Sequence, residues 1–229
     1  MMPVDPEIKI VRSRRKTIAL IVQSDGSLLV RAPLRVTQRQ IMDVVQQQAE
    51  WVRTRQEAAR QRAAAAPPKA FVEGEIFNYL GQPYRLVIAN AARPALALDA
   101  QAGQFRLAPA AQPGAAALFD AWYRRQARQV FTERVAFYAR QIGLQPQKLR
   151  ISSARTRWGS CSSRGTLSFT WRLVMAPLPV IDYVVVHELC HLQVRNHSKD
   201  FWNKVRAVMP DYKERARWLR VNGHLLRLD

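Results

Sequence analysis

The chain is poor in histidine, cysteine and acidic residues, and it contains no long apolar run. Only 4 of its 229 residues are histidine and only 2 are cysteine. No apolar segment approaches the roughly 20 residues that a membrane-spanning helix needs. The N-terminal segment MMPVDPEIKIVRSRRK lacks the apolar core of a secretory signal. We therefore expect a cytoplasmic protein without a membrane span, in which Cys161 and Cys190 are free thiols.

The shortage of acidic residues leaves a large positive charge. Lys+Arg number 36 and Asp+Glu number 17, which gives a formal net charge of +19. Such a chain attracts polyanions, including nucleic acid and nucleotide phosphates. The basic residues cluster at 12–16, 124–128 and 150–157. The alternative for each cluster is a solvated surface that maintains solubility.

The composition, 48% hydrophobic and 23% charged, is that of a globular protein, and the first third of the chain shows regular patterns. Alternating apolar residues around Asp25-Gly26 predict a hairpin over residues 8–33. Apolar residues at helical spacing predict a helix over residues 38–62. Thr37 and Gln40 resemble a capping box at its start.

The remaining sequence alternates between strand-like and helical patterns. Predicted extended segments cover residues 75–80, 84–88, 96–98, 105–107 and 149–174. Predicted helices cover residues 112–142 and the tail to about Val221. This order indicates an α+β fold. We divide it into a β-rich region with one helix, 1–111, and a catalytic core, 112–229.

Three of the four histidines lie in the segment HELCHLQVRNH, which runs from His187 to His197. On a helix, His187 and His191 lie on one face and can hold one ion. Zinc with three protein ligands keeps a position open for water, and Glu188 is placed to act as the general base. Chance predicts roughly 0.002 such HExxH matches in this composition. The sequence therefore predicts a catalytic zinc site.

The third ligand is a choice between His197 and Glu214. Asn196 can end a helix in the left-handed conformation and Ser198 can begin the next, which would turn His197 toward the metal. Metzincin proteases share this histidine spacing but have glycine where this chain has Val194, so the turn must differ. A glutamate on a later helix is the competing scheme. We favour His197.

Two non-catalytic explanations of the segment remain open. The helix could carry two half-buried histidines that are satisfied by hydrogen bonds. The site could also hold a structural zinc ion, although such sites normally have four ligands and are rich in cysteine. A glutamate directly after the first histidine favours catalysis over both.

Several motifs resemble one known family. They are Arg157–Ser162 (RWGSCS), 167–173 (LSFTWRL), 181–191 (IDYVVVHELCH) and 197–202 (HSKDFW). The chain resembles the YgjP-like family of predicted zinc-dependent hydrolases, which is related to the SprT-like and WLM metalloproteases. The resemblance extends over nearly the whole chain, so regions 1–111 and 112–229 would form one continuous family domain.

The resemblance implies a zincin-like metallohydrolase core, with a mixed sheet, an HExxH helix and an N-terminal strand-rich extension. In such a core, a strand beside the helix pairs with an extended substrate. We expect residues 166–173 to be this strand, with Phe169 and Trp171 contacting the substrate. Arg157 is expected to stabilise a developing oxyanion or to hold a phosphate.

The resemblance implies two activities that differ in the bond cleaved. One is a metallopeptidase, and the other is a nucleoside-triphosphate pyrophosphatase acting on UTP. The excess of arginine suits a triphosphate, whereas a histidine-rich site prefers zinc or another divalent transition metal to magnesium. A third alternative is a SprT-like protease that associates with DNA through the basic surface. We expect a zinc hydrolase, with a peptide or protein substrate favoured.

Overall fold

A computed structural model describes residues 8–23, 25–90 and 94–228, and the chain divides into two compact units. The first unit ends at Pro67 and the second begins at Pro68. The division therefore does not follow the expected boundary at 111/112. The strands expected in the N-terminal region after residue 75 belong to the larger unit, because their side chains pack with its long central helix.

The first unit is a small sheet with two helices. Its elements are β1 (Ile8–Ser13), β2 (Ala19–Val22), β3 (Leu28–Pro33), α1 (Gln38–Gln47) and α2 (Ala49–Ala65). Strand β3 is central, antiparallel to β2 and parallel to β1. The expected hairpin is thus β2–β3, with Gly26 at φ +85° and Asp25 accepting a bond from the Ser27 amide. Strand β1 is not part of this hairpin, and it pairs in parallel with the other edge of β3.

The helix expected over residues 38–62 is two helices that separate at Gln48. Thr37 and Gln40 form the expected capping box. Both helices bury apolar side chains in one small core, formed by Leu28, Val30, Ala32, Ile41, Val45 and Val52.

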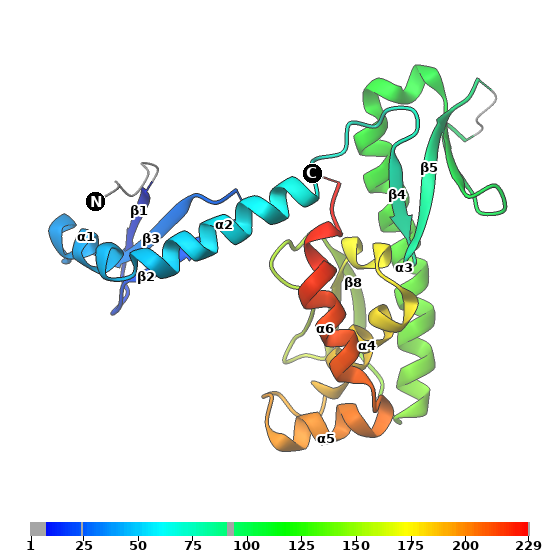
Figure 1. Ribbon diagram of the computed structural model, residues 1–229. Coiled ribbons are helices and arrows are strands. Elements are labelled where there is room, and N and C mark those ends of the chain that lie inside the picture. Colours follow the sequence, from blue (N-terminus) through cyan, green and yellow to red (C-terminus); the bar gives the residue numbers. More distant parts are fainter. Residues whose placement is uncertain (1–7, 24, 91–93, 229) are drawn as a thin grey trace. The chain divides into compact units, whose positions relative to one another are not determined.

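The second unit contains two sheets and the remaining helices (Figure 1). Its strands are β4 (Ile76–Tyr79), β5 (Gln82–Ile88), β6 (Leu96–Asp99), β7 (Gln104–Leu107), β8 (Lys148–Ser152), β9 (Gly159–Cys161) and β10 (Thr166–Thr170). Its α-helices are α3 (Ala115–Gln141), α4 (Leu178–Cys190), α5 (Lys199–Val208) and α6 (Tyr212–Asn222). The strand orders are β4-β5-β7-β6 and β8-β10-β9.

Helix α3 joins the two sheets through aromatic packing. Near its start, the Phe119 ring stacks on Phe77 of β4, with the centroids 4.1 Å apart. Further along, the Phe131 ring stacks on Phe169 of β10 at 4.5 Å. All four side chains are almost fully buried. The core of this unit therefore follows one face of α3 along most of its length.

Helix α4 is held in the interior by an ion pair and by apolar contacts. From Val180 to Cys190 its residues are buried, except His187. Asp182 accepts two bonds from the Arg134 guanidinium of α3, at 2.6 and 2.9 Å. This contact fixes α4 against α3 five residues before the first histidine of the motif.

The expectation of an α+β fold is confirmed. The strands expected between residues 75 and 107 are present as β4 to β7. The segment 149–174 is less regular than expected, because a 3₁₀ helix over Trp171–Met175 follows β10. Cys161 and Cys190 are free. No described helix has the length and apolar character needed to cross a bilayer.

Candidate metal centre

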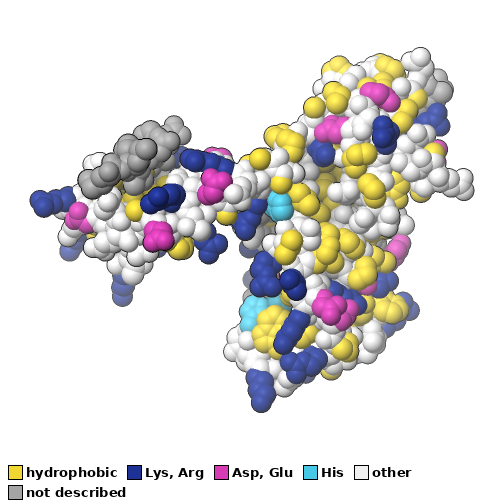
Figure 2. Space-filling view, viewed as in Figure 1, with side chains coloured by type: hydrophobic (Ala, Val, Ile, Leu, Met, Phe, Trp, Pro, Cys, Tyr) yellow, Lys and Arg dark blue, Asp and Glu magenta, His cyan; other side chains and the backbone are white. Residues whose placement is uncertain are grey.

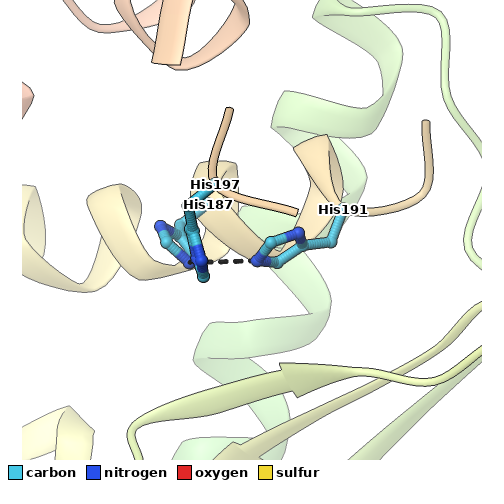
Figure 3. Close-up of side chains that lie close together, drawn as sticks. All are labelled: His187, His191 and His197. Carbon is cyan, nitrogen blue, oxygen red and sulfur yellow. Dashed lines mark hydrogen bonds between the residues drawn. The ribbon is translucent and has the colours of Figure 1, made fainter. Parts of the chain in front are cut away.

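His187 and His191 meet at the end of α4, as their spacing predicts. The Nε2 atoms of the two rings are 3.2 Å apart. His197 approaches from the following loop, and its Nε2 lies 3.1 Å from that of His187 (Figure 3). The three rings therefore point their Nε2 atoms at one position. Glu214, the competing ligand, is exposed on α6 and is not part of this cluster.

The loop that carries His197 is shaped by a bond that the sequence motif does not reveal. Helix α4 ends at Cys190, well before Asn196, and Asn196 does not take a positive φ. The Nδ1 atom of His191 lies 2.9 Å from the Val194 carbonyl oxygen. This contact favours a proton on Nδ1 and leaves the Nε2 lone pair free. Val194 thus contributes its backbone at the position where metzincins have glycine.

The donor set fits a zinc ion. Tetrahedral coordination with Zn–N distances of about 2.0–2.1 Å puts ligand nitrogens roughly 3.3 Å apart. The separations from the Nε2 of His187, 3.1 and 3.2 Å, are close to that spacing. Burial lowers the pKa of His187 to about 3, with added repulsion from the other two histidines. His187 is therefore neutral at ordinary pH and offers a lone pair to a cation.

Helix α5 supplies an aromatic wall behind the histidines. Phe201 is fully buried, and its ring centroid lies 4.9, 4.4 and 4.9 Å from those of His187, His191 and His197. Trp202 stacks on His197 at 5.7 Å. Sequence patterns indicate no role for Phe201 and Trp202, although both lie in the family-like segment 197–202. Figure 2 shows histidine, hydrophobic and basic side chains together on the surface of this unit.

Glu188 is buried beside the histidines and packs on a glycine. Only 6% of its surface is exposed. A Cβ atom added to Gly159 of β9 would lie 2.6 Å from the Glu188 Cγ and Oε1 atoms. Burial raises the pKa of Glu188 to about 7, and the positive charge of Arg157 acts in the opposite direction. Gly159 therefore provides the space that the carboxylate occupies.

Strand β9 forms the edge of its sheet next to α4. Residues 166–173 were expected to be the strand that pairs with substrate. This is wrong, because β10 is paired on both sides and has no free edge. Trp158 and Ser162 bond to β10 through their backbones. Because backbone bonding alternates in an antiparallel pair, the N–H and C=O groups of Gly159 and Cys161 face the outer edge.

The two side chains expected to bind substrate are in the core. Phe169 is 0% exposed and Trp171 is 2% exposed. Phe169 packs on α3, and the Trp171 ring is in cation–π contact with the guanidinium groups of Arg124 and Arg172. The expectation is therefore corrected: neither side chain is available to a substrate. Strongly apolar residues in a strand-like run indicate burial more often than binding.

Arg195 connects the histidine loop to the β9–β10 turn. Its guanidinium donates to the Ser162 carbonyl at 2.6 Å and to the Ser163 carbonyl at 3.0 Å. It also lies 3.7 Å from the Cys161 Sγ atom. Arg195 could not be identified from the sequence, because its contact with Ser162 spans 33 positions in the chain.

Comparison with models of protein families agrees with the resemblance. The sequence model of the YgjP-like, metallopeptidase domain matches residues 16–222, which extend across both units. No curated protein matches the chain. A solved structure, the metallopeptidase zymogen of Pyrococcus abyssi abylysin, is 24% identical with a TM-score of 0.38, covering 42% of this chain and 96% of that chain. The chain belongs to the YgjP-like family of metallopeptidase domains.

Proposed function

We propose that the protein is a zinc-dependent metallopeptidase in which His187, His191 and His197 hold the ion and Glu188 is the general base. The observation that carries the proposal is the convergence of three Nε2 atoms beside a buried glutamate. Among the described residues the cluster consists of three histidines, and a set of three protein ligands is typical of catalytic rather than structural zinc. The family match supports a peptide as the substrate.

The chemistry divides between the ion and the chain. A zinc ion held by the three imidazoles supplies Lewis-acid activation of a water molecule. Glu188 accepts a proton from the attacking water and donates it to the amine that leaves. Arg157, whose charge already acts on Glu188, is the proposed donor to the developing oxyanion. Other divalent transition metals with similar ligand preferences can substitute.

Strand β9 is the proposed docking edge for the substrate. The outward N–H and C=O groups of Gly159 and Cys161 can pair with an extended peptide, which adds a strand to the sheet. Because Glu188 packs on Gly159, a peptide bond carried along this edge passes close to the carboxylate. This assignment replaces residues 166–173 as the substrate strand.

The proposal is tested with the zinc-loaded protein and its Glu188→Gln variant on an unfolded protein and on nucleoside triphosphates. We expect proteolytic fragments from the wild type and a loss of about a hundred- to ten-thousandfold in Glu188→Gln. Zinc content, measured by mass spectrometry, stays unchanged, since Glu188 is not a ligand. Glu133→Gln, an exposed position on α3, is the matched control.

Two results would contradict the proposal. Full proteolysis by the zinc-bound Glu188→Gln variant would contradict the assignment of Glu188 as the general base. Glu188-dependent release of pyrophosphate from UTP, without peptide cleavage, would assign the nucleotide hydrolase alternative.

A further inference from the structure

A pocket of about 500 Å³ in the second unit lies outside the site described so far. Among the residues that the structure describes, it shares none with the metal centre. It is formed by the segment before β4, the first turns of α3, the loop after β8, the start of the 3₁₀ helix over Trp171–Met175, and Leu228. The activity proposed above assigns no role to these parts of the chain, so the pocket is a candidate site for a second ligand.

The charged residues that line this pocket are mostly basic. Of the described ones, only Asp120 is acidic, and the basic ones are Lys69, Arg124, Arg155 and Arg172. Asp120 accepts bonds from both the Nε and an Nη atom of Arg124, so its charge is already matched within the wall. Lysine and arginine side chains only donate hydrogen bonds. The pocket therefore favours an occupant that carries negative charge and accepts hydrogen bonds.

Two of the guanidinium groups are held in place by one serine. Arg124 donates to the Ser153 hydroxyl at 2.6 Å, and Arg172 donates to the Ser153 carbonyl at 3.2 Å. The Arg172 guanidinium also lies 4.4 Å from the centre of the Trp171 ring, and only 9% of this arginine is exposed. Because contacts within the protein already order these groups, they lose little conformational freedom when they bind a ligand.

The arrangement of the cations suits a phosphate better than a carboxylate. Arg124, Arg155 and Arg172 come from three different elements, namely α3, the loop after β8 and the 3₁₀ helix. A carboxylate offers two oxygens and one negative charge, which one arginine fork can satisfy. A phosphate group offers three strong acceptor oxygens and nearly two negative charges. It can therefore accept bonds from all three elements at once.

The rest of the lining is apolar and has room for more than a phosphate ion. Its hydrocarbon surface comes from Pro68, Phe71, Ala116 and Leu228. The Phe71 ring is itself fixed, because it stacks on Phe77 with the centroids 5.6 Å apart. A volume of about 500 Å³ is in the range of pockets that bind small organic molecules.

We propose that this pocket binds a small phosphate monoester. Arg124, Arg155 and Arg172 hold the phosphate group, and Phe71 and Ala116 contact the organic group. The site is separate from the metal centre, so this proposal goes beyond the peptidase function and does not depend on it.

The first test is isothermal titration calorimetry of the full-length protein without zinc, so that phosphate cannot bind to an ion at the metal centre. The probes are phenyl phosphate, benzoate and inorganic phosphate. We expect phenyl phosphate to bind one to one and at least about tenfold more tightly than the other two. Benzoate loses hydrogen bonds between charged groups, and inorganic phosphate loses the apolar contacts of the ring.

Three results of this titration would contradict the proposal. Absence of phenyl phosphate binding would remove the site, and equal affinity for benzoate would overturn the choice of a phosphate group. Equal affinity for inorganic phosphate would overturn the organic part and identify the free ion as the ligand.

The second test removes one cation. Arg155→Gln should weaken the binding of phenyl phosphate about ten- to hundredfold, because a hydrogen bond between charged groups is lost. Arg150→Gln is the matched control, since Arg150 is also exposed but lies outside the lining. We expect it to change the Kd by no more than about twofold. Equal weakening in both variants would indicate a general effect of surface charge and would overturn the site.

The third test fills the apolar part of the pocket. Ala116→Phe should reduce the preference for phenyl phosphate over inorganic phosphate to about threefold or less, since its ring occupies the space of the organic group. Ala117→Phe, at the next position of α3, is exposed and outside the lining, and it should keep the wild-type preference. A wild-type preference in Ala116→Phe would contradict the placement of the organic group.

Discussion

At the scale of single residues, Gly159 controls the position of Glu188. Its missing side chain is the space in which the carboxylate lies, 2.6 Å from where a Cβ would be. We expect Gly159→Ala to displace Glu188 and to lower kcat/KM at least about tenfold, since misplaced catalytic groups lose rate steeply. Steady-state kinetics together with zinc analysis check this, because the ligands themselves are untouched.

Gly114→Ala is the control for this substitution. No atom lies within 4 Å of a Cβ added at Gly114, and its φ of −102° suits alanine. Its activity should match the wild type. If Gly159→Ala were equally active, Glu188 would have to tolerate a shifted position, and the tight packing would have no catalytic meaning.

The residues that sequence alone could identify are those with local spacing. His187, His191 and Glu188 follow from a helical repeat, and His197 follows from its position just beyond it. The contacts of Gly159 and Arg195 do not follow from local spacing. Gly159 meets Glu188 of α4, and Arg195 meets Ser162 of the β9–β10 turn, in each case across about thirty residues of chain. Only the folded structure brings such distant positions together.

At the scale of elements, α5 packs on the candidate metal centre through Phe201. This ring contacts all three histidine rings without being a ligand. We expect Phe201→Leu to weaken zinc binding about ten- to hundredfold, as is typical when the surroundings of ligands are changed. Competition with a chelating dye measures the affinity.

Phe137→Leu tests whether the effect is specific to this wall. Phe137 is on α3 and is 49% exposed. The zinc affinity of the Phe137→Leu variant should equal that of the wild type. Unchanged affinity in Phe201→Leu would mean that the histidine rings hold their positions without α5.

The contact between α3 and α4 depends on Arg134 and Asp182. Breaking a largely buried, bidentate pair leaves a charge without its partner, so Asp182→Ala should reduce the free energy of unfolding by about 2–4 kcal/mol. Urea denaturation measures this. Asp120→Ala removes the more exposed Arg124–Asp120 pair and should cost no more than about 1 kcal/mol. Equal losses would contradict the importance of burial.

Strand order is the element-level feature that the sequence did not reveal. The run 166–173 has the apolar character of a strand beside an active-site helix, and β10 is indeed a strand. Its partners, however, come from 148–152 and 159–161, and they enclose it on both sides. The short segment β9 carries little apolar signal, so the edge position is visible only in the fold.

At the scale of the whole molecule, two separate cores predict two unfolding events. The histidines all lie in the unit that begins at Pro68. Zinc at a hundred times its Kd should stabilise that unit by about 2.7 kcal/mol. Its melting temperature should rise by about 5–10 °C, while the transition of the first unit stays in place. Calorimetry with and without zinc measures both.

His191→Ala provides the comparison for the melting experiment. Without this ligand, the zinc-dependent rise should largely disappear. A rise that persists in His191→Ala, or one that affects both transitions equally, would place the stabilising zinc elsewhere.

The fold class and most elements could be predicted from the sequence, whereas the position of the boundary between the two compact units could not. Periodic patterns indicated the α+β class and most elements, because amphipathic periodicity is a local property. The compact units divide at 67/68 and not at 111/112, because the β4–β7 sheet packs on α3, which follows it in the chain, through pairs such as Phe77 and Phe119. The affinity for polyanions expected from the charge of +19 stays a prediction.

The open edge of β9 bears on whether the protein digests its own unfolded copies. Strand pairing uses backbone groups that every polypeptide shares, so the proposed docking edge would not distinguish foreign chains from copies of this protein. Unfolded copies of this protein would therefore be digested by folded ones. Preparations kept with zinc should lose intact chain in proportion to their unfolded fraction, and a chelator should protect them.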